Sequence, residues 1–327
     1  MGVDSGAWEP QYTDRRMMEP PPQPLLGDVH HTPPTHDPVA CRRWWHLERR
    51  DVQPAWLHEE VARRMQERLS WIKSSPLDWV HANPCLGGWQ VHELIVRRYP
   101  KATAYIHEPT AARRSRSLAQ LSPKGWRQLN PWAAKPIALA PGHWPEPVDM
   151  VWANMQLHVH EDPQSLLQQW HQSLRVDGFV MFSCLGPDSL MELRQLHEHM
   201  GWPVAGSTWT DMHDWGDMLV QTGFAEPVMD MERITLSYAN AQGLLSDLRQ
   251  LGRNLHPDRY ARLRGRGWRQ RWLEAVEAHW PKRSDDGQFL LTFEIVYGHA
   301  LRPEARHRVD TTTRISLGEM KNMLRPG

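Results

Sequence analysis

Cysteine is scarce in this chain of 327 residues, which contains only Cys41, Cys85 and Cys184 and no Cys-x-x-Cys pair. A scattered set with an odd number argues against a disulfide framework and against a zinc site built from cysteines. A net charge is also lacking, because 38 basic side chains balance 38 acidic ones. The chain is therefore not a polycation that holds nucleic acid by bulk charge, and we expect no nucleic-acid partner.

Long apolar runs are missing as well. No stretch approaches the roughly 18 apolar residues that a membrane span needs. The N-terminal sequence MGVDSGAWEPQYTD has no apolar region of the kind found in signal peptides. The Gly-x-Ser-x-Gly, P-loop and His-Glu-x-x-His motifs are absent. We therefore expect a cytoplasmic protein without membrane association, and none of these three enzyme classes.

Proline content and apolar periodicity divide the chain into segments. Residues 1–40 contain eight prolines and almost no periodic pattern, which predicts a disordered leader. Residues 41–75 are predicted to be an N-terminal helical segment, because apolar residues recur three or four positions apart in AWLHEEVARRMQERLSWIK. A main domain is expected at 76–301, with a helical insert at about 240–285, followed by a polar tail at 302–327.

The main domain alternates between short β-rich runs and helical patterns, which predicts an α/β fold with a parallel sheet and right-handed crossovers. The last run, FLLTFEIVYGHA, is long enough to close an edge of that sheet. The predicted strands are Leu77–Ala82, Thr103–His107, Ile137–Ala140, Val148–Ala153, Gly178–Cys184, Val228–Leu236 and Leu291–His299. The predicted helices include Trp89–Arg98, Ala111–Gln120, Gln164–Leu174, Ser189–Met200 and His213–Thr222.

Ligands of open α/β sheets lie beyond the carboxyl ends of the strands, so the residues that follow each strand are the candidate site. Glu108 follows the second strand, where a carboxylate can accept hydrogen bonds from both hydroxyls of a ribose. Asn154 and Gln156 follow the fourth strand, where an asparagine or glutamine suits an adenine edge or a backbone cap. Gly87 and Gly88 follow the first strand and can bring backbone close to a ligand. An ordinary turn, a solvated glutamate and a capping asparagine are the structural alternatives.

Several segments resemble class I methyltransferases, and more narrowly the malonyl-acyl-carrier-protein O-methyltransferases of biotin synthesis. They are VDMVWANMQLHVHEDP, LRVDGFVMFSCLGPDSLMELRQL, TDMHDWGDMLVQTGFAEPVMDMERITLSY and TFEIVYGHAL, together with the upstream LHEEVARRMQERL. The resemblance covers roughly residues 39–301. It implies a Rossmann-like sheet of seven strands, mostly parallel with one antiparallel strand, that binds S-adenosylmethionine.

The resemblance also assigns residues to the cofactor. Asp78 falls on the acidic residue that ends the first strand, Glu108 on the ribose-binding carboxylate, and Asn154 on the loop beside the methionine part. In the family the aspartate precedes a Gly-x-Gly-x-Gly loop, whereas here those glycines are Val80, Ala82 and Pro84. Proline lacks an N–H, and a β-carbon intrudes where glycine allows close approach.

This departure leaves two readings open. In the first, a loop that contains Val80, Ala82, Gly87 and Gly88 still binds S-adenosylmethionine, and the chain is an O-methyltransferase. In the second, the chain is an inactive pseudo-methyltransferase that serves as a protein-binding partner. A dehydrogenase of related topology is a third alternative, but the dinucleotide fingerprint is absent.

The family's reaction methylates the free carboxylate of a malonyl thioester on an acyl-carrier protein. A carboxylate is ionised at neutral pH, so the reaction needs no general base and no metal, and the sequence identifies no catalytic residue. An arginine would hold the carboxylate through paired hydrogen bonds. The insert is rich in arginine, and Arg253, Arg264 and Arg266 are candidates for docking the acidic carrier protein. A solvated helix face is the alternative.

Two further polar clusters allow simpler explanations. His158-Val-His160 could ligate a metal, although such a pair before a helix is commonly polar surface. Asp211, His213, Asp214 and Asp217 could form an acid–base or metal group. The simpler prediction is that Thr210 or Asp211 is the N-cap of a helix whose first turn is acidic.

Overall fold

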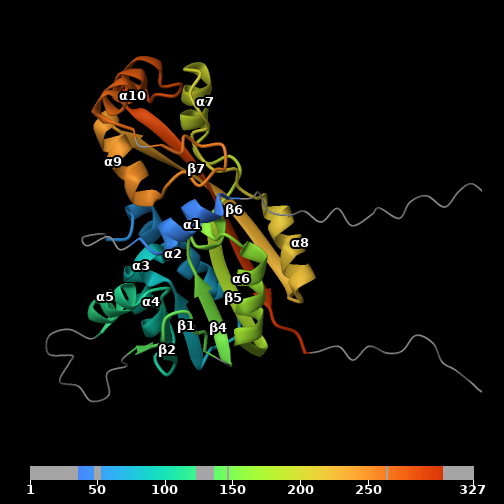
Figure 1. The fold of residues 1–327 in the computed structure, drawn as a ribbon. Helices are drawn as coiled ribbons and strands as arrows, with labels where there is room; N and C mark the ends of the chain where they lie inside the picture. Colours follow the sequence, from blue (N-terminus) through green and yellow to red (C-terminus); the bar gives the residue numbers. More distant parts are fainter. Residues whose placement is uncertain (1–35, 48–52, 123–135, 146, 263, 305–327) are drawn as a thin grey trace, which may run out of the picture. The chain divides into compact units, whose positions relative to one another are not determined.

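The computed structural model describes residues 36–47, 53–122, 136–145, 147–262 and 264–304 (Figure 1). The expected disordered leader therefore lies outside the described residues up to position 35, as does the tail from 305. The order of the sheet is β3-β2-β1-β4-β5-β7-β6. The strands are β1 (Asp78–Ala82), β2 (Thr103–His107), β3 (Ile137–Ala138), β4 (Val148–Ala153), β5 (Leu174–Leu185), β6 (Ala225–Tyr238) and β7 (Phe289–Leu301).

The pairing of the strands confirms the predicted fold class. The strands β3, β2, β1, β4 and β5 are mutually parallel, and β7 runs antiparallel to both of its neighbours, β5 and β6. The expected edge strand was wrong, however, because β7 is internal and β6 forms the edge. Their burial gives the reason: β7 is buried along nearly its whole length, whereas most of β6 alternates between exposed and partly buried residues. A strand covered on both faces belongs inside a sheet.

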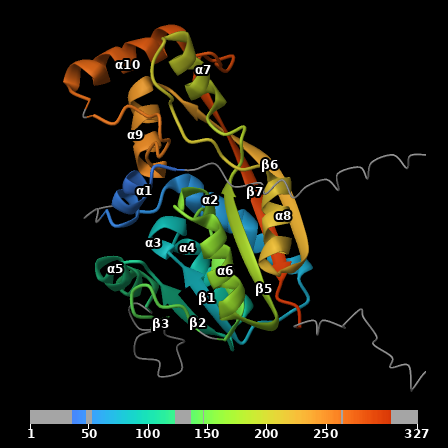
Figure 2. The ribbon, with the colours of Figure 1, turned by 45° about the vertical axis from the view of Figure 1, so that its right-hand side comes forward.

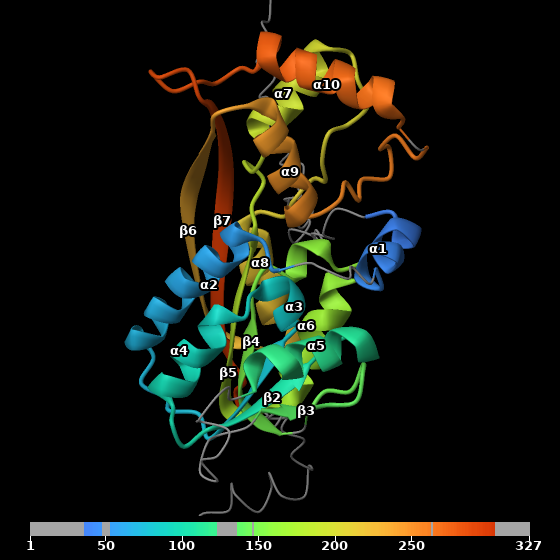
Figure 3. The same cartoon turned by 90° about the vertical axis from the view of Figure 1, so that its left-hand side faces the viewer.

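Helices cover both faces of the sheet (Figures 2 and 3). Helices α2 and α4 pack together on one face, with Trp79 and Trp152 in the same apolar cluster. On the other face, α6 and α8 pack against β4, β5 and β6. The bounds are α2 (Trp56–Arg68), followed by the 3₁₀ turn η1 (Leu69–Trp71), α3 (Pro84–Gly87), α4 (Gln90–Arg98), α5 (Ala111–Leu121), the 3₁₀ turn η3 (Leu157–Val159), α6 (Pro163–Ser173) and α8 (Met212–Thr222).

Helix α1 (Pro38–Trp45) crosses the boundary expected at residue 40. It begins there because the carboxylate of Asp37 accepts hydrogen bonds from the N–H groups of Val39 and Ala40, and because Pro38 fits the first helical position. Helix α1 also packs on Leu86, which belongs to the segment after β1. Helix α1 thus lies over the segment that follows β1.

Helices α7 (Met191–His199), α9 (Ala241–Leu251) and α10 (Arg266–His279) gather at one end of the molecule (Figure 1). Both α9 and α7 contact α10, and β6 and β7 extend toward them. The residues expected as a helical insert therefore form two helices, which we call the lid together with α7. No helix among the described residues is long and apolar enough to cross a membrane.

The antiparallel pairing of β5 with β7 offers a test of how closely these two strands pack. Gly298 lies opposite Phe182, and a β-carbon at Gly298 would stand 2.2 Å from that ring. We expect Gly298→Ala to lower the free energy of unfolding by about 1–3 kcal/mol, because the fully buried ring has no free space to enter. Denaturant titration measures this change.

Gly267→Ala on α10 is the matched control, because a β-carbon at this position would meet no neighbouring group of the described chain within 4 Å. We expect this substitution to be neutral or to stabilise the chain by about 0.5–1 kcal/mol. Equal effects of the two substitutions would contradict the packing described for β5 and β7.

Candidate functional site

Glu108 directly follows β2 and is only 1% exposed. Its Oε1 accepts hydrogen bonds from the hydroxyl of Ser117 at 2.6 Å and from the N–H of Cys85 at 2.8 Å. Its Oε2 is buried without a partner in the described part of the chain. Burial raises the pKa of this carboxyl, and the two hydrogen bonds oppose the shift in part. A ligand hydroxyl that donates to Oε2 would therefore relieve a buried, half-satisfied group.

Asn154 follows β4, and both polar atoms of its side chain form hydrogen bonds within the protein. Its amide nitrogen donates to the backbone oxygen of His58 at 2.8 Å and to that of Gly87, and its Oδ1 accepts from the hydroxyl of Ser183 at 2.6 Å. These contacts join α2, the segment after β1, and β5. Asn154 thus orients the site, while its proposed contact with a cofactor stays a prediction.

Gly87 and Gly88 are close-packed against protein atoms. A β-carbon at Gly87 would lie 2.8 Å from the backbone oxygen of Asn154. Gly88 has a φ of 118°, and a β-carbon there would lie 2.7 Å from the carboxylate of Glu59. Glu59, which the sequence did not single out, accepts hydrogen bonds from the N–H groups of Trp89 and Gln90 and so caps α4. These glycines shape the segment for the protein's own contacts.

The structure moves the cofactor segment relative to the expected alignment. Asp78 begins β1 rather than ending it, and its carboxylate pairs with Arg175 at 2.9 Å. The alignment at Asp78 was wrong on this point, because Arg175 holds both Asp78 and Asp149 at the amino ends of the strands. Val80 and Ala82 lie inside β1, fully buried and with ordinary backbone. The first residue beyond the strand is Asn83.

Asn83 is a buried residue that sequence reasoning missed, and Gln156 is a buried residue that it named only beside Asn154. Asn83 is 0% exposed and has a left-handed backbone with φ 50° and ψ 54°. Gln156 is 1% exposed and lies two positions after Asn154. Within the described chain, neither amide group has a hydrogen-bond partner. The signal available in the sequence was the pair Asn83-Pro84 directly after an apolar run, because asparagine tolerates positive φ.

The carboxyl ends of the neighbouring strands β2, β1 and β4 thus carry three incompletely paired polar side chains, Glu108, Asn83 and Gln156. Leaving such groups unpaired in a protein interior costs about 1–3 kcal/mol each. These donors and acceptors fit a nucleoside ligand with ribose hydroxyls and an amino-acid end. The residues present therefore fit S-adenosylmethionine, although they are not the glycines that the resemblance implied.

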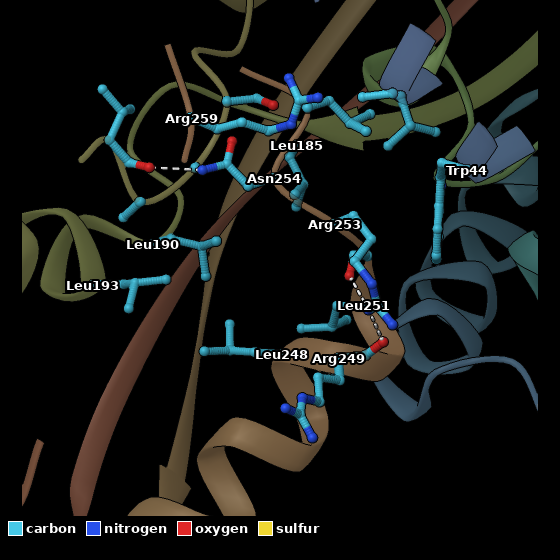
Figure 4. Close-up of a pocket in the computed structure, with 18 of the residues that line it drawn as sticks. Trp44, Leu185, Leu190, Leu193, Leu248, Arg249, Leu251, Arg253, Asn254 and Arg259 are labelled. Atoms are coloured by element: carbon cyan, nitrogen blue, oxygen red, sulfur yellow. Dashed lines mark hydrogen bonds between the residues drawn. The ribbon is translucent and has the colours of Figure 1, made fainter. Parts of the chain in front are cut away.

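A cavity of about 850 Å³ is lined by Met155 after β4, by Leu185 at the end of β5, by α1 and by the lid (Figure 4). Leu190 and Leu193 lie on one side of it, Trp44 on the other, and Leu248 and Leu251 on α9. Further apolar lining residues are Leu57, Met155, Leu185, Val204, Trp209, Leu245, Leu255, Trp268, Trp272 and Phe293. The cavity is thus a mostly apolar chamber that adjoins the candidate cofactor residues.

Seven arginines line the same cavity, without any aspartate or glutamate among its described lining residues. They are Arg43, Arg249, Arg253, Arg259, Arg262, Arg264 and Arg269. The guanidinium of Arg264 stacks on Trp268 at 3.8 Å and on Tyr260 at 4.8 Å. Arg253 lies over Trp44 at 5.7 Å. Arg266 is exposed at the start of α10, outside the lining, so two of the three arginines predicted from the sequence line the cavity.

Two buried histidines, His58 and His158, line the cavity near the strand ends. The Nδ1 of His58 donates to the backbone oxygen of Leu86 at 2.8 Å, so this nitrogen carries the proton. Burial lowers the pKa of His58 to about 4 and holds the pKa of His158 well below its usual value. Both imidazoles are therefore uncharged at neutral pH.

The acidic cluster follows the simpler expectation, whereas the expectation of polar surface was wrong for His158, which is buried. Asp211 is the N-cap of α8, and its carboxylate accepts a hydrogen bond from the N–H of His213 at 2.8 Å. The Nδ1 of His160 contacts the backbone oxygen of Asp162 at 2.7 Å. Among the described residues, no group of three or more histidines, cysteines, aspartates or glutamates is placed to hold a metal ion.

The chain is similar in sequence to proteins that share one name. It is 38% identical over 265 residues to the malonyl-acyl-carrier-protein O-methyltransferase of Laribacter hongkongensis, a match that covers 78% of this chain and 85% of that one. It is 37% identical over 261 residues to the enzyme of the same name from Gallionella capsiferriformans, covering 77% and 86%. No protein-family model matches the chain.

Solved structures with a similar arrangement include a putative methyltransferase from Bacillus halodurans. The TM-score is 0.49 and the identity 11%, over 75% of this chain and 99% of that chain. A putative sarcosine dimethylglycine methyltransferase from Galdieria sulphuraria gives a TM-score of 0.41 at 9% identity, over 73% and 85%.

The buried histidines predict that acid destabilises the fold. Burial lowers the pKa of His58, His92 and His107 to about 4 from the ordinary value of 6.5. The unfolded chain therefore binds more protons than the folded one below pH 6.5. We expect the free energy of unfolding to be highest above that pH and to fall toward pH 4, by roughly 1.4 kcal/mol per pH unit for each such histidine.

Chemical unfolding across this pH range measures the effect, and His107→Phe provides a matched variant. His107 stacks on Trp144 at 4.0 Å, and neither ring nitrogen has a partner in the described structure. Phenylalanine retains the stacked ring without a titrating group, so its dependence on pH should be shallower. An identical slope in His107→Phe and the wild type would contradict this account.

Proposed function

This chain belongs to the malonyl-acyl-carrier-protein O-methyltransferase family, and from that membership we propose that it methylates the free carboxylate of a malonyl thioester on an acyl-carrier protein. The methyl donor is S-adenosylmethionine, and the reaction belongs to biotin synthesis. The observation that carries the proposal is the identity of 37–38% to relatives of that name over most of both chains. A cytoplasmic location and the absence of a nucleic-acid partner stay predictions.

The cofactor supplies a methyl group on a positively charged sulfur. The carboxylate of the substrate is already the nucleophile at neutral pH, so the protein has no proton to remove from it. What the chain must provide is alignment of the two reactants and exclusion of water. The neutral state of His58 and His158 suits this task, because two imidazolium ions at this end of the cavity would repel a cationic donor.

The apolar walls of the cavity exclude water from the reacting carboxylate. Leu185 at the end of β5, and Leu190 and Leu193 before and within α7, form part of these walls. A carboxylate that enters such an environment needs a fixed positive partner to offset its loss of hydration. The arginines of the lining are the groups able to hold it, through two parallel hydrogen bonds from one guanidinium.

Glu108 is the residue that we propose for the ribose of the cofactor, because its Oε2 is buried and unpartnered among the described residues. Helix α1 covers this region through the contact of Cys41 and Trp44 with Leu86. The N-terminal segment is tied down at several points, among them the ion pair between Asp37 and Arg259 at 2.6 Å. Because Glu108 is 1% exposed, a ribose reaches its Oε2 only if the groups that cover this carboxylate move.

The carrier protein is the partner that the arginine-rich lid suits. Acyl-carrier proteins are acidic, and the exposed arginines around the cavity mouth present the opposite charge. We expect the double variant Arg264→Glu/Arg266→Glu to weaken binding of malonyl-acyl-carrier protein by roughly tenfold or more, and most strongly at low salt. Calorimetry at two salt concentrations measures this effect.

A charge-matched control separates docking from net charge. Arg98→Glu/Lys101→Glu makes the same change in charge at the far end of the sheet, where α4 leads into β2. This control should bind the carrier protein like the wild type, and both variants should retain affinity for S-adenosylmethionine. Equal carrier affinity in the lid variant and the control would contradict docking on the lid.

The proposed reaction is tested by transfer of labelled methyl groups from S-adenosylmethionine to purified malonyl-acyl-carrier protein. We expect incorporation of the label into the malonyl carrier, in the form of an ester that mild base removes. Acetyl-acyl-carrier protein, which has the same carrier and thioester but no free carboxylate, should take up none. Equal labelling of both carriers, or of neither, would contradict the proposed acceptor.

A further inference from the structure

The backbone after β1 has no N–H group left to offer a ligand. Between Asn83 and Gln90, every residue except Pro84 donates its N–H to an acceptor in the protein. Four of these N–H groups donate to backbone oxygens: Asn83 to that of His107, Leu86 and Gly87 to that of Asn83, and Gly88 to that of Pro84. The other three donate to side-chain carboxylates: Cys85 to Oε1 of Glu108, and Trp89 and Gln90 to the carboxylate of Glu59.

This pattern differs in kind from a glycine-rich loop, whose value is that bare backbone approaches the ligand. Here the longest of the seven donations spans 3.0 Å, so none is a marginal contact that a ligand could easily take over. The acceptors Glu59 and Glu108 are carboxylates, which form stronger hydrogen bonds than neutral groups. Recognition of a ligand by this backbone would require breaking contacts that also hold α2 and α4 in place.

In contrast to this fully hydrogen-bonded backbone, two side chains at the same strand ends lack hydrogen-bond partners within the described residues. Asn83 is 0% exposed and Gln156 is 1% exposed, and in the described chain both atoms of each amide group lack partners. The neighbouring Asn154 has the same burial but full hydrogen bonding, so burial here does not by itself leave an amide unpaired. The two unpaired amides lie at the ends of the adjacent strands β1 and β4.

We propose that the side-chain amides of Asn83 and Gln156 bind S-adenosylmethionine in place of the glycine backbone that its relatives' loop implies. The inference rests on the proposed function. A carboxamide both donates and accepts, and so suits a ligand that carries an ammonium, a carboxylate and an adenine edge. The left-handed backbone of Asn83 is a conformation that glycine adopts without strain, and here it carries an amide side chain.

The two modes of recognition predict opposite results for Asn83→Gly. Glycine accepts the left-handed backbone without strain and removes the amide. If the amide binds the cofactor, the affinity for S-adenosylmethionine falls by about 10- to 100-fold, as expected for lost hydrogen bonds to a charged group. If bare backbone is the recognition element, the affinity is unchanged or increases.

Calorimetric titration of the full chain with S-adenosylmethionine and with S-adenosylhomocysteine is the primary readout, and thermal unfolding without ligand is the second. Removal of an unpaired buried amide should leave the ligand-free melting temperature unchanged or higher, while affinity falls. Gln156→Ala should show the same loss of affinity. Gln168→Ala, an exposed glutamine on α6, is the control and should bind like the wild type.

Weakened binding in both amide variants, with the ligand-free fold intact, supports the inference. Wild-type affinity in Asn83→Gly and Gln156→Ala overturns it and leaves the proposed function standing. If the wild-type chain binds neither ligand at millimolar concentration, both the inference and the proposed function are overturned.

Discussion

The N–H groups of the buried turn after β1 need hydrogen-bond acceptors, and this requirement organises the carboxyl end of the sheet. The chain leaves β1 at Asn83 beneath helix α1 and enters α4 at Gln90, and most of the residues between them are buried. Glu108 and Glu59 supply the acceptors that this turn lacks. The same two contacts orient the carboxylate at the end of β2 and fix α2 on α4. A change at either carboxylate therefore affects the fold and the candidate site together.

Two neighbouring regions of the site suit different ligands: the strand ends and the cavity beside them. The strand ends hold incompletely paired polar groups, which suit a small polar cofactor. The cavity beside them is apolar within and rich in arginine, which suits an acyl group with a free carboxylate on an acidic carrier. The lid belongs to the second region, because α9, α10 and the segment between them supply part of its walls and six of its seven arginines. Under the proposed function, we infer that the two ligands meet beside Leu185, the last residue of β5, and Met155, which follows β4.

Periodic apolar patterns in the sequence were enough to predict the helices and strands of the α/β fold. Local patterns failed to predict features that depend on contacts with residues far away in the sequence. Strands β2 and β4 have the predicted bounds, because alternation of strand and helix leaves a strong signal. The alignment at Asp78 failed because Asp78 lies at the amino end of β1, where it pairs with Arg175, 97 residues away in the sequence. The resemblance placed the end of the first strand at Asp78, and so directed attention to Val80 and Ala82 rather than to Asn83, the first residue after β1. Whether β7 lies at an edge of the sheet depends on which other strands pair with it, and the sequence of β7 alone does not specify those partners.

A crystal structure of the full chain with S-adenosylhomocysteine tests this account most directly. We predict the nucleoside at the carboxyl ends of β1, β2 and β4, with a ribose hydroxyl on Oε2 of Glu108 and with the amides of Asn83 and Gln156 bonded to the ligand. The N–H groups from Asn83 to Gln90 should keep the partners that they have without ligand. A ligand held by those N–H groups, with both amides still unpaired, would contradict the account.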